Sequence, residues 1–270
     1  MGGGRSTWLF QPEPRPQARV RLFCFPYAGG GAAVYRSWPR SLPSWVDFCA
    51  VQPPGRGWRF KETPFTRVAD LVDALADAVE PLLDLPHLLF GHSLGAVVAF
   101  EFAREVRRRH GRSPLRIVVA AHRAPHIADP RPPIHSTSDE DFLRLVQERY
   151  RGGIPAEVVR EPEILRLLLP ALRADLEMDW TYRFAPDRPL DCPITAVGGE
   201  QDSTVAFAQI TAWNRHTTGV FRAESVPGDH FFLDDAEAPL ARFLLQGLQG
   251  LARSSSWSAD ATQAHELRRP

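Results

Sequence analysis

The sequence predicts an α/β fold with a mostly parallel central sheet and helices on both of its faces. Strand-like and helical segments alternate along the chain with short connections, which is typical of a parallel sheet covered on both sides. A stretch at about 136–182 has helical periodicity and no strand signal, so it predicts a helical lid inserted between two strands. One large domain over residues 18–252 is therefore expected, with a flexible arm at 1–17 and a disordered tail at 253–270.

Short apolar runs predict the strands of the sheet, at residues 20–25, 48–51, 87–90, 115–121, 193–197 and 221–226. Apolar residues at helical spacing predict helices at 68–83, 96–108 and 239–251. A further helix is expected from Ala32 or Ala33 to about Pro39. Pro81 is expected to kink the helix over 68–83 or to end it early, because proline cannot donate the helical hydrogen bond.

The composition is that of an ordinary soluble globular protein. Thirty-two basic and 32 acidic residues give a formal net charge of zero, which offers no electrostatic reason to expect binding to nucleic acid or a membrane surface. The apolar runs are too short to span a membrane, and the first residues lack the apolar core of a secretory signal. Cys24, Cys49 and Cys192 are dispersed and are interpreted as reduced, buried small hydrophobes, so a cytoplasmic protein is expected.

The segment Gly91-His92-Ser93-Leu94-Gly95 is the strongest functional signal in the chain. It follows the apolar run 88–90 and precedes a helical segment, which is the setting of a nucleophile elbow. The two glycines leave room for a tight, strained turn that places the serine at its apex. Ser93 is therefore the candidate nucleophile.

A serine nucleophile needs a base and an acid, which follow it in the order acid, then histidine, in α/β-hydrolases. His230 lies on a glycine-containing loop between the last strand and the last helix, where the base belongs. Asp202, just past the strand at 194–197, is favoured as the acid over Glu200, which is closer to the strand end. The preceding strand offers no carboxylate until Asp129, well past its end, while His92 is expected to be a structural neighbour.

The developing oxyanion would need two backbone N–H donors. Leu94 follows the nucleophile, and Ala28 lies in the glycine-rich loop after the first predicted strand, so these two residues are the candidates. That loop has neither dinucleotide-binding nor Walker spacing. His122 and His126 have the spacing of metal ligands, but Pro125 between them prevents the helix that would align them, so no metal is expected.

With these residues in place, the chain resembles the type II thioesterases, stand-alone α/β-hydrolases that accompany polyketide synthases and nonribosomal peptide synthetases. The resemblance extends over residues 22–248 and rests on separate segments: 22–30, 54–57 (Pro-Gly-Arg-Gly), 90–95, 170–175 (Pro-Ala-Leu-Arg-Ala-Asp), 189–194 and 230–233. It implies hydrolysis of stalled or mis-primed acyl groups from the phosphopantetheine arm of acyl or peptidyl carrier proteins, with no cofactor of the enzyme's own. It also implies a triad of Ser93, Asp202 and His230, the same residues that the spacing favours.

Other functions use the same residues and stay open at this point. A general carboxylesterase or lipase, or an acyltransferase, would use the same triad, whereas a non-catalytic binding module of this fold would usually have lost part of it. A cluster of basic residues ends the helix after the elbow: Arg104, Arg107, Arg108, Arg109 and Arg112. This cluster either complements the helix dipole, which is the favoured interpretation, or meets an acidic carrier protein.

Overall fold

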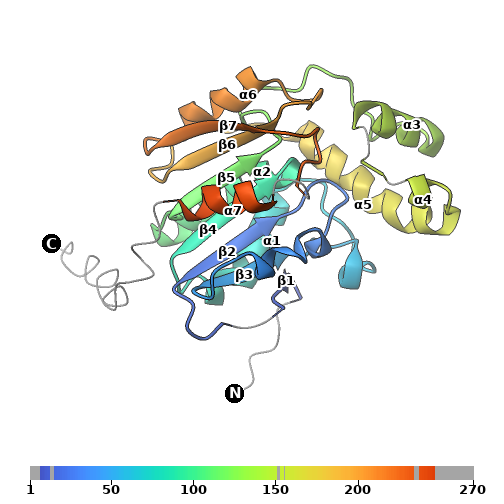
Figure 1. The fold of residues 1–270 in the computed structure, drawn as a ribbon. Helices are drawn as coiled ribbons and strands as arrows, with labels where there is room; N and C mark the ends of the chain where they lie inside the picture. The colour runs from blue at the N-terminus through green and yellow to red at the C-terminus, as the bar shows by residue number, and fades with distance from the viewer. Residues whose placement is uncertain (1–6, 13–14, 151–152, 155, 234–236, 247–270) are drawn as a thin grey trace, which may run out of the picture.

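The computed structural model describes residues 7–12, 15–150, 153–154, 156–233 and 237–246. Within these residues, seven strands form one sheet in the order β1-β3-β2-β4-β5-β6-β7 (Figure 1). Every neighbouring pair is parallel except β1 and β3, which are antiparallel. The strands are β1 (Leu9–Phe10), β2 (Val20–Phe25), β3 (Val46–Val51), β4 (His87–His92), β5 (Arg116–Ala120), β6 (Ile194–Gly199) and β7 (Phe221–Val226). The predicted fold class, a mostly parallel sheet between layers of helices, is confirmed.

Helices cover both faces of the sheet. The α-helices are α1 (Val68–Val79), α2 (Leu94–His110), α3 (Asp139–Arg149), α4 (Ala156–Val159), α5 (Pro162–Thr181), α6 (Phe207–Thr211) and α7 (Glu237–Leu245). Short 3-10 helices are η1 (Ala32–Tyr35), η2 (Trp38–Arg40), η3 (Gly57–Arg59), η4 (Glu80–Leu82) and η5 (Ala212–His216). The helices α1 and α2 pack together on one face, whereas η1, η2 and α7 cover the other.

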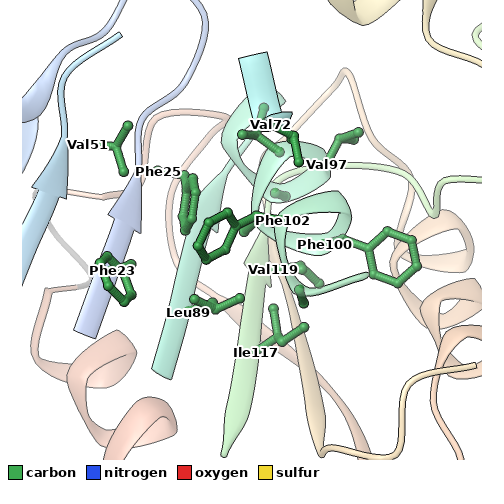
Figure 2. Packing of buried hydrophobic residues seen from close by; sticks show 14 of the residues in the cluster. Phe23, Phe25, Val51, Val72, Leu89, Val97, Phe100, Phe102, Ile117 and Val119 are labelled. Carbon is green, nitrogen blue, oxygen red and sulfur yellow. The ribbon is translucent and has the colours of Figure 1, made fainter. Parts of the chain in front are cut away.

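Alternation along the strands divides the core into two apolar layers. In β2, Phe23 and Phe25 contact the layer formed with α1 and α2, where Phe102 packs against both rings (Figure 2). Their neighbours Leu22 and Cys24 belong to the opposite layer, under η1 and α7. Because successive side chains of a strand point to opposite faces, a strand that is apolar throughout must be covered on both sides.

The structure differs from the sequence-based expectation near the N-terminus. The chain at Leu9–Phe10 is not part of a loose arm, because it pairs with Val51 and Ala50 at the edge of the sheet. The helix expected from Ala32 or Ala33 to Pro39 is instead the two 3-10 helices η1 and η2. Pro81 lies in η4 directly after α1, which ends at Val79, so of the two expected effects of Pro81 the structure shows the early end.

The predicted lid is confirmed as a helical segment without strands among its described residues. It contains α3, α4 and α5 and lies to one side of the sheet (Figure 1). The chain leaves the sheet after β5 and returns at β6, yet these two strands pair directly. No described helix has the length and apolarity needed to cross a membrane. Residues 1–6 of the predicted arm, and the whole predicted tail at 253–270, lie outside the described residues.

The basic end of α2 is engaged in contacts within the protein. Gly111 ends the helix in a left-handed conformation and donates its N–H to the carbonyl of Arg107. The side chains of Arg104, Arg107 and Arg109 pair with acidic residues on α1, on α2 and before β6, and Arg108 pairs with Glu105. These contacts favour the structural interpretation of the arginine cluster over a carrier-binding surface.

A buried histidine at the start of β4 makes stability depend on pH. Burial lowers the pKa of His87 to about 4, below its ordinary value of about 6.5. Between these values the unfolded chain binds more protons, so the free energy of unfolding falls as the pH drops from about 6.5 to about 4. We expect His87→Gln to reduce the difference in the free energy of unfolding between pH 7 and pH 5 by on the order of 1 to 3 kcal/mol, measured by urea unfolding at the two pH values. An unchanged pH slope in this variant would contradict the assignment.

Candidate active site

Ser93 lies at the turn between β4 and α2 in a strained conformation. Its backbone has φ 53° and ψ −124°, a region that residues with a side chain seldom adopt. The flanking glycines are required sterically, because a Cβ at Gly91 would lie 2.0 Å from the Gly95 carbonyl oxygen, and one at Gly95 would lie 2.1 Å from that of Phe25. The predicted elbow is confirmed as a strand, a tight turn and a helix.

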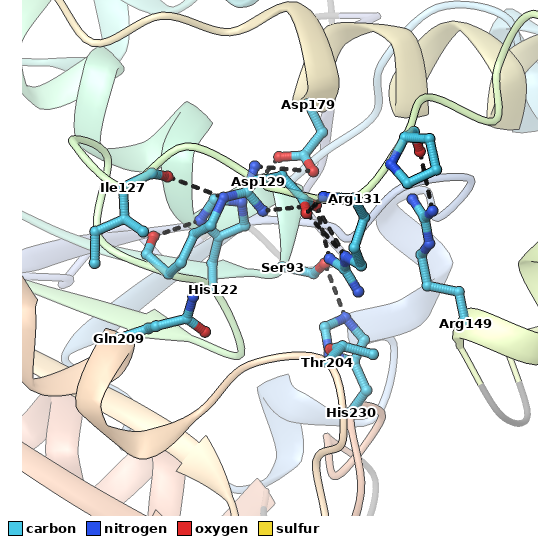
Figure 3. Close-up of polar contacts among 12 residues, drawn as sticks. Ser93, His122, Ile127, Asp129, Arg131, Arg149, Asp179, Thr204, Gln209 and His230 are labelled. Carbon is cyan, nitrogen blue, oxygen red and sulfur yellow. Dashed lines mark hydrogen bonds and ion pairs between the residues drawn. The ribbon is translucent and has the colours of Figure 1, made fainter.

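The three residues predicted as a triad come together at the carboxyl ends of the strands. Ser93 Oγ lies 3.0 Å from His230 Nε2 (Figure 3), and His230 Nδ1 lies 2.9 Å from Asp202 Oδ2. The side chains of His230 and Asp202 are 6% and 0% exposed, so solvent does not compete for these contacts. The serine hydroxyl can therefore donate to a histidine that donates in turn to a carboxylate, which is the arrangement of a nucleophile, a base and an orienting acid.

The loops after β6 and β7 hold the acid and the base in position. Thr204 donates its backbone N–H and its hydroxyl to Asp202 Oδ1, each at 2.7 Å. Burial alone would raise the pKa of Asp202, but the hydrogen bonds from His230 and Thr204 lower it below the ordinary value. Asp202 is thus a carboxylate near neutral pH.

His92 is the structural neighbour that the sequence predicts, and it supports the loop of the base. Its Nε2 lies 2.7 Å from the carbonyl oxygen of His230, to which it donates a hydrogen bond. Burial lowers the pKa of His92 to about 3, so the ring is neutral at physiological pH. The contact therefore fixes the backbone at His230 without adding a charge beside the base.

The two candidate oxyanion donors border the same pocket as Ser93 and His230. Leu94 is the first residue of α2, where a backbone N–H has no partner within the helix. Ala28 follows Tyr27 in a turn closed by a hydrogen bond from Gly30 N–H to the Tyr27 carbonyl, at 2.9 Å. Both residues line a pocket that also contains Ser93 and His230.

The lid supplies most of the remaining wall of this pocket. Apolar lid residues Val146, Leu172 and Leu176 line it together with Phe231. Tyr150, at the end of α3, has its ring centroid 5.3 Å from that of His230. The pocket is therefore largely apolar around the serine, as a site for an acyl group would be.

One wall of the pocket is polar, and sequence reasoning missed it. Asp179 of α5 lines the pocket and accepts a hydrogen bond from His122 Nε2 at 2.8 Å. Arg123 lies 3.6 Å from the same carboxylate, and Figure 3 shows Asp129 and Arg131 beside it. Burial opposes ionisation, but His122 and the arginines lower the pKa of Asp179 well below its ordinary value. Only the fold brings this lid residue to the chain after β5, so no local pattern could have identified it.

The rejected candidates lie in other surroundings. Glu200 is exposed, and Asp202 rather than Glu200 contacts His230. Asp129 pairs with Arg131. His122 is hydrogen-bonded to Asp179, whereas His126 Nδ1 lies 2.8 Å from His216 Nε2. The rings of His122 and His126 therefore contact different partners instead of forming one metal site.

The cysteines are placed as expected. Cys24, Cys49 and Cys192 are free and buried, and burial raises the pKa of each thiol, to about 12 for Cys192. Buried thiols of high pKa are poor nucleophiles, since the thiolate is the reactive form.

The order of the parallel strands, the elbow after β4 and the lid between β5 and β6 place this protein among the α/β-hydrolases. The family model for the thioesterase domain matches residues 20–246, and the chain belongs to that family. It is a thioester hydrolase.

Three similar proteins illustrate the relationship. The protein named linear gramicidin dehydrogenase LgrE from Brevibacillus parabrevis is 40% identical over 90% of this chain and 93% of its own length. The solved structure of RedJ, a thioesterase from the prodiginine pathway of Streptomyces coelicolor, is 36% identical with a TM-score of 0.77, covering 86% of this chain and 89% of RedJ. The type II thioesterase BorB from the borrelidin cluster is 33% identical with a TM-score of 0.79, covering 92% and 98%. The first name describes another reaction, and the family model agrees with the two thioesterases.

Proposed function

We propose that the protein hydrolyses acyl thioesters on the phosphopantetheine arm of carrier proteins and so removes stalled or mis-primed groups in polyketide or nonribosomal peptide biosynthesis. The observation that carries the chemistry is the contact of 3.0 Å between Ser93 Oγ and His230 Nε2, in a pocket that is otherwise largely apolar. The relatives RedJ and BorB support the substrate class, because both are thioesterases of biosynthetic pathways of this kind.

The proposed reaction has two halves. His230 takes the proton of Ser93 while Oγ attacks the thioester carbonyl, and Asp202 holds the imidazole in the required tautomer. The N–H groups of Ala28 and Leu94 stabilise the tetrahedral oxyanion. The carbon–sulfur bond breaks, the thiol leaves with the proton from His230, and an acyl-enzyme ester remains on Ser93. Water then attacks this ester with His230 as base, which releases the acid and restores the serine.

A comparison of matched esters tests the substrate class. We expect kcat/KM for an acyl group on a carrier protein to exceed that for the same acyl group in an oxygen ester by at least about tenfold, since the carrier adds binding contacts and the thiolate leaves more readily. The measurement is acid release by chromatography, with Ser93→Ala as the blank. A preference for oxygen esters would favour a carboxylesterase, and product formed with an added alcohol or amine instead of water would favour an acyltransferase.

A further inference from the structure

The loop that carries Ala28 is hydrogen-bonded to the lid through a buried carboxylate. We call residues 27–31 the oxyanion loop. Its turn requires a glycine at position 29, where φ is +78°. Gly29 donates its N–H to Asp175 Oδ2 of the lid helix α5, at 2.7 Å. Gly29, the residue next to the proposed oxyanion donor Ala28, is thus held by a side chain of the lid, which follows β5 in the sequence.

Asp175 is held in turn by Arg56. The guanidinium donates to both carboxylate oxygens, with Nη1 2.5 Å from Oδ2 and Nη2 2.8 Å from Oδ1. Nη1 also lies 3.2 Å from the carbonyl oxygen of Gly30, so Arg56 contacts the oxyanion loop as well. The side chains of Arg56 and Asp175 are only 6% and 4% exposed. A bidentate pair without competing water has a well-defined geometry, which makes it suitable for fixing a loop.

A second side chain, Gln52, links Arg56 to Ala32, the residue directly after the oxyanion loop. Its amide donates to the carbonyl of Arg56 at 2.9 Å, and its oxygen accepts the N–H of Ala32 at 3.1 Å. The segments Pro-Gly-Arg-Gly and Pro-Ala-Leu-Arg-Ala-Asp, which the sequence singled out only by resemblance, are therefore the two sides of one contact. Both meet at the oxyanion loop.

We propose that Asp175 is a positioning residue for the oxyanion hole, which makes the lid helix α5 and the oxyanion loop one mechanical unit. The inference rests on the proposed function, since it takes Ala28 N–H as an oxyanion donor. Donors of this kind must be held within about 0.5 Å of the productive geometry, and loss of one donor lowers kcat by roughly 10²- to 10³-fold. Without the Asp175 carboxylate the oxyanion loop would be held less firmly. Part of the stabilisation of the oxyanion would then be lost while the acyl pocket stays in place.

The test is Asp175→Asn, which retains the shape of the side chain but cannot accept from Gly29 and both nitrogens of Arg56 at once. We expect kcat to fall roughly 10- to 100-fold while KM changes by less than about threefold, because the oxyanion exists only in the transition state. The affinity for an alkylboronic acid, which forms a tetrahedral adduct with the serine, should fall by the same factor as kcat/KM. Hydrogen exchange at Ala28 and Gly29, followed by mass spectrometry of the peptide 26–32, should become faster.

A matched control lies at the opposite end of the sheet. Arg21 and Asp47 form a pair with side chains 9% and 6% exposed, near the amino ends of β2 and β3. Asp47→Asn should lower stability, as removal of any buried partner does, without changing the boronate affinity. If Asp175→Asn leaves Arg56 too poorly compensated for folding, Arg56→Gln combined with Asp175→Asn removes both charges and is measured in the same way.

The outcomes separate the two proposals. Unchanged kcat, boronate affinity and exchange at the oxyanion loop in a folded Asp175 variant would overturn the positioning role, as would equal effects from Asp47→Asn. Failure of the unmodified protein to hydrolyse any thioester would instead refute the proposed function. In that case the hydrogen-exchange measurement still tests whether Asp175 holds the oxyanion loop, because it does not depend on turnover.

Discussion

Ser93→Ala should lower kcat for an acyl-N-acetylcysteamine thioester by roughly 10⁴- to 10⁶-fold. The alanine removes the oxygen that lies 3.0 Å from His230 and that is proposed to form the acyl-enzyme. The measurement is thiol release, with trapping of the acyl-enzyme by mass spectrometry. Ser203→Ala, which removes an exposed hydroxyl next to Asp202, is the control and should retain activity. A rate for Ser93→Ala within tenfold of the unmodified enzyme would refute the nucleophile assignment.

A glycine at position 93 separates the effect of losing the hydroxyl from the effect of backbone strain. Ser93 has a positive φ of 53°, and glycine adopts that region without the steric cost of a Cβ. Ser93→Gly should therefore be as inactive as Ser93→Ala, yet more stable than the unmodified protein by about 1 kcal/mol. Thermal unfolding of the three proteins measures this difference, and a less stable glycine variant would show that the strained turn is not a cost to the fold.

Asp202→Asn should lower kcat by roughly 10³- to 10⁴-fold with little change in the fold. The amide has nearly the shape of the carboxylate, but it cannot stabilise the imidazolium that forms when His230 takes the proton, and it favours the wrong tautomer. The hydrogen bonds that hold Asp202 ionised, from His230 and Thr204, give the reason to expect so large an effect. Thiol release over pH 6 to 9 measures it.

Glu200 provides the control for this prediction. It lies two residues before Asp202 in the loop after β6, but its side chain is exposed. Glu200→Gln removes a negative charge from the same loop and should change kcat by less than about twofold, since exposed charges are screened. A larger loss from Glu200→Gln than from Asp202→Asn would reverse the assignment of the acid.

The features that the sequence could predict are those with a local physical cause. Gly91 and Gly95 are dictated by contacts within the elbow itself, so the turn is readable from five residues. The positions of Asp202 and His230 follow because the carboxyl ends of parallel strands meet at one edge of the sheet, which brings distant loops together once the strands are known. Their geometry agrees with the expectation, and their catalytic roles stay predictions until the variants are measured.

The features that could not be predicted depend on contacts between distant segments. Leu9–Phe10 is too short to show a strand pattern, and only the exposed edge of β3 makes it one. Two 3-10 helices, η1 and η2, stand in place of the expected helix, and their Tyr35 and Trp38 pack against Phe90 of β4, which is distant in the sequence. Asp175 and Asp179 are one helical turn apart on α5, yet they face different partners, which no periodicity reveals.

The lid leaves the sheet after β5 and returns at β6, and these strands are neighbours. A segment whose two ends meet in this way can be exchanged for another without altering the order of the strands, so a different lid would change the pocket while the sheet stays the same. The contact of Asp175 with Gly29 and Arg56 limits that freedom. A transplanted lid that lacks an acid at this position would bring a new pocket and leave the catalytic machinery beneath it loosely assembled.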